Sequence, residues 1–153
     1  MKKDEILEFL NDVKVAHTKW VDRADNLMKG IDIEDKATPV DAKECAFGKW
    51  FYGDGQKLNV LSSVPLQCMQ EMETTHADFH KSYLSIYNVY FSEKKGGFLS
   101  NFFKGKKELT PEERNFVEEK YKEMKELSKK LVDEIDRLDR RITAISDERI
   151  EVL

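Results

Sequence analysis

The stretch "TPEERNFVEEKYKEMKELSKKLVDEIDRLDRRI", residues 110–142, decides the fold class. Thr110, Pro111 and Glu113 have the spacing of a capping box with proline in the first turn, which predicts that a helix begins here. No glycine or proline follows in the rest of the chain. A last helix of about forty residues, about 60 Å long, is therefore expected.

The apolar residues of this helix recur in alternating steps of four and three, the heptad spacing that packs one helix against another. They are Val117, Tyr121, Met124, Ser128, Leu131, Ile135, Leu138, Ile142 and Ile145, with Ser128 the polar member. Residues 111–130 are expected to pack on the chain's own helices. Beyond residue 131 the seam is expected to need a partner chain, because the other predicted helices are too short to reach it. We therefore predict a bundle over residues 1–130 and a C-terminal extension over residues 131–153, for coiled-coil dimerisation or signal output.

Two helices are predicted near the amino terminus. Between residues 4 and 29 apolar positions recur at helical steps, and Gly30 then favours a stop. "DAKE", residues 41–44, has the form of a second capping box. A short helix from there through Tyr52 is expected.

A further long helix is predicted to begin at Pro65 and to run to about residue 92. Residues 93–109, which contain three glycines and five lysines, are interpreted as a loop. The fold class predicted from these elements is all-α: an antiparallel four-helix bundle with an extra short helix and a long C-terminal coiled-coil-like helix.

Composition narrows the classes of partner. The chain has 153 residues, enough for one domain, and a net charge of −4, so no concentrated basic face for nucleic acid is expected. The opening "MKKDEILEFLNDVK" lacks the apolar run of an export signal, and no window of apolar residues is long enough to span a membrane. A soluble cytoplasmic protein is therefore expected, without nucleic-acid or membrane partners.

Two of the chain's three histidines lie four residues apart in "HADFH", residues 76–80. On a helix His76 and His80 would share one face and could converge on one ion, although such a pair alone is a weak motif. His17 lies on the inner stripe of the first helix, where an unpaired imidazole is costly to bury. Cys45 is expected in the first turns of the second helix, where the positive helix end and a metal favour a thiolate.

These four residues together indicate a metal site. Three nitrogens and one sulfur would fill a tetrahedral shell, and histidine and cysteine both suit zinc. The full array of a di-iron bundle, with Glu-x-x-His repeated on two helices and an inward Glu on each of two others, is absent from the sequence. The sequence predicts Zn²⁺ as cofactor, with no catalytic residue and no other cofactor-binding residue.

The motifs "HTKW" (17–20), "CAFGKWFY" (45–52) and "HADFH" (76–80) resemble those of the CZB family, the chemoreceptor zinc-binding domains of bacteria. The family pattern is His followed three residues on by Trp, then Cys-x-x-Gly-x-Trp with an aromatic next, then His-x-x-x-His. The resemblance extends over residues 5 to about 130. Trp20 and Trp50 are interpreted as core aromatics that shield the site.

The resemblance implies an antiparallel helical bundle, usually dimeric, that holds one zinc through His17, Cys45, His76 and His80. Such domains are usually fused to chemoreceptor signalling regions or diguanylate cyclases and are associated with sensing zinc and oxidants such as hypochlorous acid. The 153 residues hold neither output region. A free-standing regulator, or the sensory piece of a longer chain, is therefore expected.

The function expected is that of a sensory or regulatory domain and not of an enzyme. Either zinc occupancy or oxidation of Cys45 would be the signal, and a homodimer would pass it to chemotaxis or cyclase signalling proteins. One alternative is a structural dimer that zinc staples together. Another is a zinc hydrolase with Cys45 displaced by water, for which no Asp or Glu is placed as an obvious general base.

Overall fold

The computed structural model describes residues 2–31, 40–61, 66–91 and 108–153, with the backbone alone for residues 66–68. The elements, in chain order, are α1 (Lys3–Met28), α2 (Ala46–Tyr52), the 3-10 helix η2 (Asp54–Val60), α3 (Leu66–Phe91), α4 (Pro111–Thr143) and α5 (Asp147–Glu151). No strand occurs in these ranges. The prediction of an all-α fold is confirmed.

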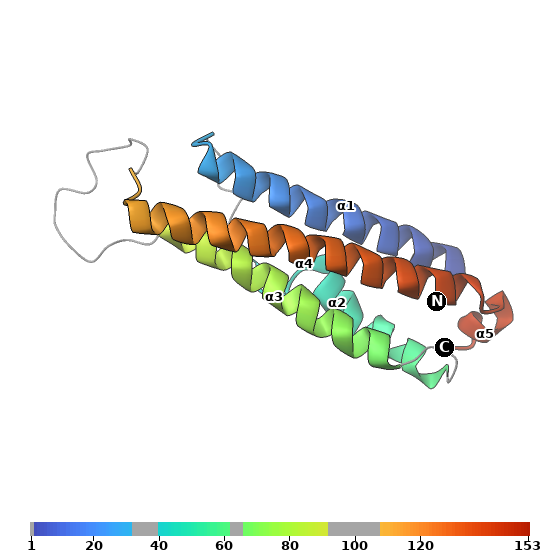
Figure 1. The fold of residues 1–153 in the computed structure, drawn as a ribbon. Helices are drawn as coiled ribbons and strands as arrows, with labels where there is room; N and C mark the ends of the chain where they lie inside the picture. The colour runs from blue at the N-terminus through green and yellow to red at the C-terminus, as the bar shows by residue number, and fades with distance from the viewer. Residues whose placement is uncertain (1, 32–39, 62–65, 92–107) are drawn as a thin grey trace.

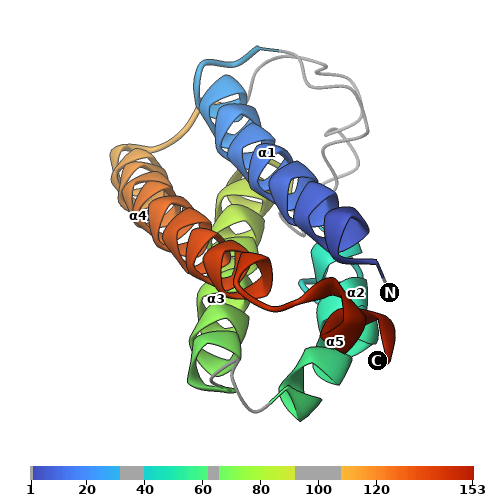
Figure 2. The ribbon, with the colours of Figure 1, turned by 90° about the vertical axis from the view of Figure 1, so that its right-hand side faces the viewer.

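The long helices α1, α3 and α4 lie side by side, and α4 runs in the opposite direction to the other two (Figure 1). The short α2 and η2 take the fourth side of the bundle (Figure 2). Of the helix pairs, α3 and α4 pack most extensively, followed by α1 and α4. The bundle is therefore antiparallel, and its fourth side is a short helix continued by a 3-10 helix.

The core consists of two apolar clusters at opposite ends of the bundle. One joins the start of α1 and α3 to the end of α4, and its members include Ile6, Leu10, Val13, Met72, Leu131, Ile135, Leu138 and Ile142. The other joins the end of α1 and α3 to the start of α4, with Ala24, Leu27, Phe79, Tyr83, Ile86, Val117 and Met124. On α1, His17 lies between the residues of the two clusters.

The helix boundaries signalled by caps are confirmed at α4 and α1. Thr110 Oγ1 accepts a hydrogen bond from the Glu113 N–H at 3.1 Å, and a Glu113 carboxylate oxygen accepts from the Thr110 N–H at 3.0 Å. Gly30, which follows α1, has φ of 65°, a conformation that a Cβ would disfavour.

The expected course of the last helix is wrong beyond Thr143. Helix α4 has 33 residues, and α5 follows it after a turn instead of extending it. The Lys3 ammonium holds this turn by donating to the Ile145 carbonyl at 2.8 Å and pairing with Asp147 at 3.2 Å. The chain therefore folds its last residues back on its own bundle.

The expectation that the seam beyond residue 131 needs a partner chain is also wrong. Its residues are fully buried within one chain: Leu131, Ile135, Leu138 and Ile142. They pack in the same cluster as Ile6 and Leu10, because α1 has 26 residues and begins beside the end of α4. The homodimer and the domain boundary at residue 130 stay predictions. The exposed seam that was expected to support them is not present, because the chain buries it itself.

The second helix begins later than its sequence signal. Asp41 forms a turn instead of a cap, since its side chain accepts from the Lys43 N–H at 2.9 Å and its carbonyl accepts from the Glu44 N–H at 2.9 Å. Helix α2 begins at Ala46, and the extended Cys45 is its N-cap residue. The expectation of Cys45 inside the helix is therefore corrected: its sulfur is the cap.

The predicted loop over residues 93–109 and the helix start at Pro65 fall largely outside the described residues, as does the Cys68 side chain. In the ranges that are described, every helix is too short or too polar to cross a bilayer.

Candidate metal centre

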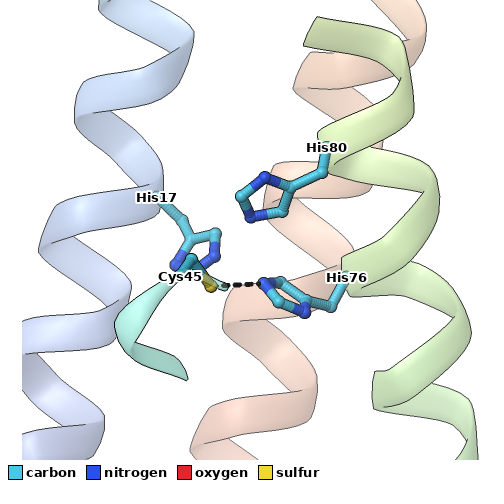
Figure 3. A group of neighbouring side chains, drawn as sticks. All are labelled: His17, Cys45, His76 and His80. Atoms are coloured by element: carbon cyan, nitrogen blue, oxygen red, sulfur yellow. Dashed lines mark hydrogen bonds between the residues drawn. The ribbon is translucent and has the colours of Figure 1, made fainter. Parts of the chain in front are cut away.

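All four residues predicted to bind metal come together in the middle of the bundle (Figure 3). His17 comes from α1, Cys45 from the cap of α2, and His76 and His80 from successive turns of α3. One nitrogen or sulfur atom of each lies within 4.8 Å of those of the other three. The structure thus brings the complete predicted set to one point.

Backbone carbonyls orient two of the imidazoles. His17 Nδ1 donates to the Val13 carbonyl at 2.8 Å, and His80 Nδ1 donates to the Val40 carbonyl at 2.8 Å. This pattern places the proton on Nδ1 and leaves the lone pair of Nε2 free for a metal. Both Nε2 atoms are buried and have no hydrogen-bond partner among the described residues. An unsatisfied buried nitrogen is costly, and a metal ion would satisfy both.

His76 and Cys45 form the other half of the group. His76 Nε2 lies 3.3 Å from Cys45 Sγ. The sulfur also accepts from the Gly48 N–H at 3.2 Å and donates to the Ala42 carbonyl at 3.3 Å. An N–H in the first turn of a helix favours a thiolate at this position, and a metal would complete the deprotonation.

Burial keeps the histidines in the form that binds metal. It lowers the pKa of His17 to about 4, and, with repulsion from His80 and His17, lowers the pKa of His76 to about 2. Burial also lowers the pKa of His80 and raises the pKa of the Cys45 thiol. Without metal the three imidazoles are therefore neutral at neutral pH, and the thiol must lose its proton to become a ligand.

The spacing of the four ligand atoms can be compared with that of a zinc shell. Ligand atoms of a tetrahedral zinc shell are about 3.5 Å apart, given zinc–nitrogen and zinc–sulfur bonds of about 2.0–2.3 Å. The largest separation here, within 4.8 Å, therefore requires a contraction of about an ångström. Within the described part of the chain the group contains no carboxylate, and three nitrogens with one sulfur favour zinc over magnesium or calcium.

Aromatic rings surround the four residues. Phe47 meets His76 edge to face at 4.8 Å between centroids, and Phe79 lies 5.4 Å from His17. Trp20 lies 6.2 Å from His80, as a shielding residue should. Trp50 packs against Phe47, with 6.0 Å between the ring centroids, and so lies further from the histidines than Phe47 does. The rings limit access of water to the nitrogens, which strengthens electrostatic interactions at this point.

Comparison with known families points to the same chemistry. Residues 17–87 match the family model of chemoreceptor zinc-binding (CZB) domains. The match begins at His17 and includes Cys45, His76 and His80. It therefore contains all three motifs, although it is shorter than the expected range of residues 5 to about 130. The resemblance and the prediction of zinc as cofactor are confirmed at the level of the family. Neither curated proteins nor solved structures give a significant match.

Sequence reasoning missed the two carbonyls that orient the imidazoles of His17 and His80. Val13 lies four residues before His17 on the same helix, so helical spacing could have indicated it. Val40 lies forty residues before His80 and reaches it only through the fold. No local signal identifies such a contact.

Proposed function

We propose that His17, Cys45, His76 and His80 bind one zinc ion, and that the chain is a sensory or regulatory domain whose signal arises there. The observation that supports this most directly is the convergence of two buried, unpartnered imidazole nitrogens, among the described residues, on a third imidazole and a thiol. Four protein ligands drawn from three separate elements would fill the tetrahedral shell of one zinc ion. Zinc would hold these elements together when bound.

One candidate signal is zinc occupancy. Loss of zinc leaves the Nε2 atoms of His17 and His80 unsatisfied in the core, so the helices that carry them gain freedom to separate. Zinc binding and bundle stability would then be coupled. The output would follow the zinc concentration.

The other candidate signal is oxidation of Cys45. Cys45 is partly exposed, whereas the three histidines are 4–7% exposed, so Cys45 is the most accessible residue of the four. Hypochlorous acid would oxidise the thiolate by two electrons: a sulfur–oxygen bond forms, the oxygen–chlorine bond breaks and chloride leaves with its electron pair. The sulfenic acid formed would be a weaker ligand, and α2 would shift.

This signal would pass to chemotaxis or cyclic-di-GMP signalling proteins in the cytoplasm, with the chain acting as a homodimer and not as an enzyme. Four protein ligands would fill the zinc shell and leave no position for water or substrate, which favours this over a zinc hydrolase. A dimer in which zinc is only a structural staple is the other alternative.

The first test is the zinc content of protein purified without added metal. We expect about one zinc per chain in the wild type and in Cys68→Ala, which removes the other cysteine. Cys45→Ala should retain less zinc under a chelator challenge, because one of four ligands is lost. A wild-type protein that takes up no zinc at micromolar concentrations would overturn the proposal.

Hydrogen exchange separates the two signals and the structural staple. If oxidation is the signal, one equivalent of hypochlorous acid, or Cys45→Asp, increases exchange in α2 while zinc stays bound. If occupancy is the signal, chelation produces the change and oxidant produces it only by releasing zinc. Zinc that the chelator cannot remove, together with exchange that does not respond to oxidant, would identify the staple.

A further inference from the structure

Helix α4 is the longest helix of the bundle, yet the four metal-binding candidates come from other elements. It passes behind them in Figure 3 and leads to the C-terminal turn and α5. Any effect of the metal centre on α4 must therefore travel through side chains packed between α4 and its neighbours.

A buried hydrogen bond joins α4 to the helix that carries two of the imidazoles. The Thr75 hydroxyl, on α3, donates to Glu134 Oε1, on α4, at 3.0 Å. Thr75 is 1% exposed and directly precedes His76, while Glu134 is fully buried between Leu131 and Leu138 of the apolar seam. The bond thus connects the residue beside a metal ligand to the centre of α4.

The Thr75–Glu134 bond is costly to break because the Glu134 carboxyl is buried and has few other partners. Glu134 Oε2 is buried without a hydrogen-bond partner in the described part of the chain, and the exposed Lys130 ammonium is 3.7 Å from Oε1. The Thr75 hydroxyl is therefore the closest partner of a carboxyl group that burial keeps at a raised pKa. Apolar contacts tolerate sliding of one helix along another. A hydrogen bond forms only over a narrow range of distance and angle, so it restricts both the rotation of α3 about its axis and its position along α4.

Thr75 itself stays satisfied if the link breaks. Its hydroxyl also lies 3.0 Å from the Glu71 carbonyl in the preceding turn, which shares the hydroxyl proton. Movement of this turn of α3 would therefore leave Glu134 with the exposed Lys130 ammonium as its one partner among the described residues, while Thr75 keeps the Glu71 carbonyl. Loss of the bond therefore destabilises α4, which carries Glu134, more than α3.

We propose that the Thr75–Glu134 hydrogen bond couples the metal centre to α4, an inference that rests on the proposed function. Thr75 is a positioning residue for His76, and Glu134 is its counterpart on α4. Convergence of the imidazoles and formation of this bond support each other, since both require the same placement of α3. When the imidazoles separate, the bond breaks and α4 loosens around a buried carboxyl group that has lost its hydrogen bond to α3.

The test compares zinc affinity, measured by chelator competition, in Thr75→Val and in Thr74→Val. Thr75→Val removes the hydroxyl and keeps the side-chain shape. Thr74→Val is the matched control, since Thr74 is exposed and its hydroxyl donates to the Gln70 carbonyl. We expect a Kd about five- to tenfold weaker for Thr75→Val, and a Kd within about twofold of the wild type for the control. Thr75→Ser, which keeps the hydroxyl, should bind like the wild type.

A merely structural bond would destabilise the zinc-free and zinc-bound proteins equally and leave the zinc Kd unchanged. Hydrogen exchange of α4 with and without zinc is the second readout. Zinc should protect α3 and α4 in the wild type, but α3 alone in Thr75→Val. An unchanged Kd together with normal zinc protection of α4 would overturn the inference.

Glu134→Met keeps the test decisive if Thr75→Val does not fold. It replaces a buried carboxyl with an apolar side chain of similar length, a change that is often neutral or stabilising. We expect this variant to fold, but zinc should no longer slow hydrogen exchange in α4. If zinc still slows exchange in α4, the coupling is contradicted. Wild-type protein that binds no zinc defeats the proposed function, whereas variants that match a zinc-binding wild type defeat the coupling alone.

Discussion

Gly48 has no room for a side chain, and this determines where the Cys45 sulfur lies. A Cβ at this position would be 1.9 Å from the Ala42 carbonyl oxygen, because the turn before α2 packs directly on the first turn of the helix. The same turn supplies the Ala42 carbonyl to which the thiol donates, while the Gly48 N–H donates to the sulfur. One glycine therefore sets the approach of two backbone groups to the sulfur of Cys45.

Gly48→Ala should displace this turn and move the sulfur away from the imidazoles. We expect a loss of about 1–3 kcal/mol in the free energy of unfolding, together with weaker zinc retention under a chelator. Denaturant unfolding and metal analysis measure the two effects. Lys49→Ala, at the exposed neighbouring position, is the control, and equal behaviour of the two variants would show that the close approach has no role in the site.

At the scale of elements, α4 is amphipathic over its whole length and its buried seam is covered by α1 and α3. The seam residues Ile135 and Leu138 are fully buried and belong to the cluster that contains Ile6 and Met72. Their packing is therefore intramolecular, and it should stabilise each chain independently of any dimer.

Ile135→Ala should lower the free energy of unfolding by about 2–5 kcal/mol through lost burial and the cavity that remains. Val152→Ala, at a position that is 82% exposed, should change it little. Denaturant unfolding at several protein concentrations is the measurement. If the effect of Ile135→Ala shrinks strongly on dilution, a partner chain must cover the seam after all.

At the scale of the molecule, the candidate metal centre lies between two apolar clusters, so the protonation state of its histidines affects the stability of the whole bundle. Burial holds the folded-state pKa of His17 at about 4 and of His76 at about 2, below the value of 6.5 for an exposed histidine. Below pH 6.5 the unfolded chain therefore takes up protons that the folded chain does not. The contribution of the neutral histidines to the free energy of unfolding is therefore fully present above pH 6.5 and is lost as the pH falls toward the folded-state pKa.

Metal-free protein should consequently lose stability between pH 6.5 and about 4, where His17 alone contributes on the order of 3 kcal/mol. Denaturant unfolding in the presence of a chelator measures this loss, and His17→Gln should reduce its slope by removing one of the groups. Zinc should raise the unfolding temperature at neutral pH and lose this effect in acid, as protons displace it from the ligands. A pH profile that is the same in His17→Gln and the wild type would contradict the assignment.

The sequence by itself determined the features that depend on a few neighbouring residues. Thr110, Pro111 and Glu113 set the start of α4, Gly30 marks the end of α1, and the spacing of His76 and His80 places two imidazoles on one face of α3. These signals act within one or two helical turns, so they are readable without knowledge of the fold. The four candidate metal ligands could be predicted from these signals and from the order of the three motifs.

Only the tertiary structure decided which distant groups meet. It placed the Val40 carbonyl on His80, made Cys45 the cap of α2, bent the chain after Thr143 and covered the α4 seam from within. It also put the Glu134 carboxyl beside Thr75, across 59 residues of sequence. Such contacts depend on how whole helices pack, and a heptad pattern specifies that a helix has a partner without specifying which one.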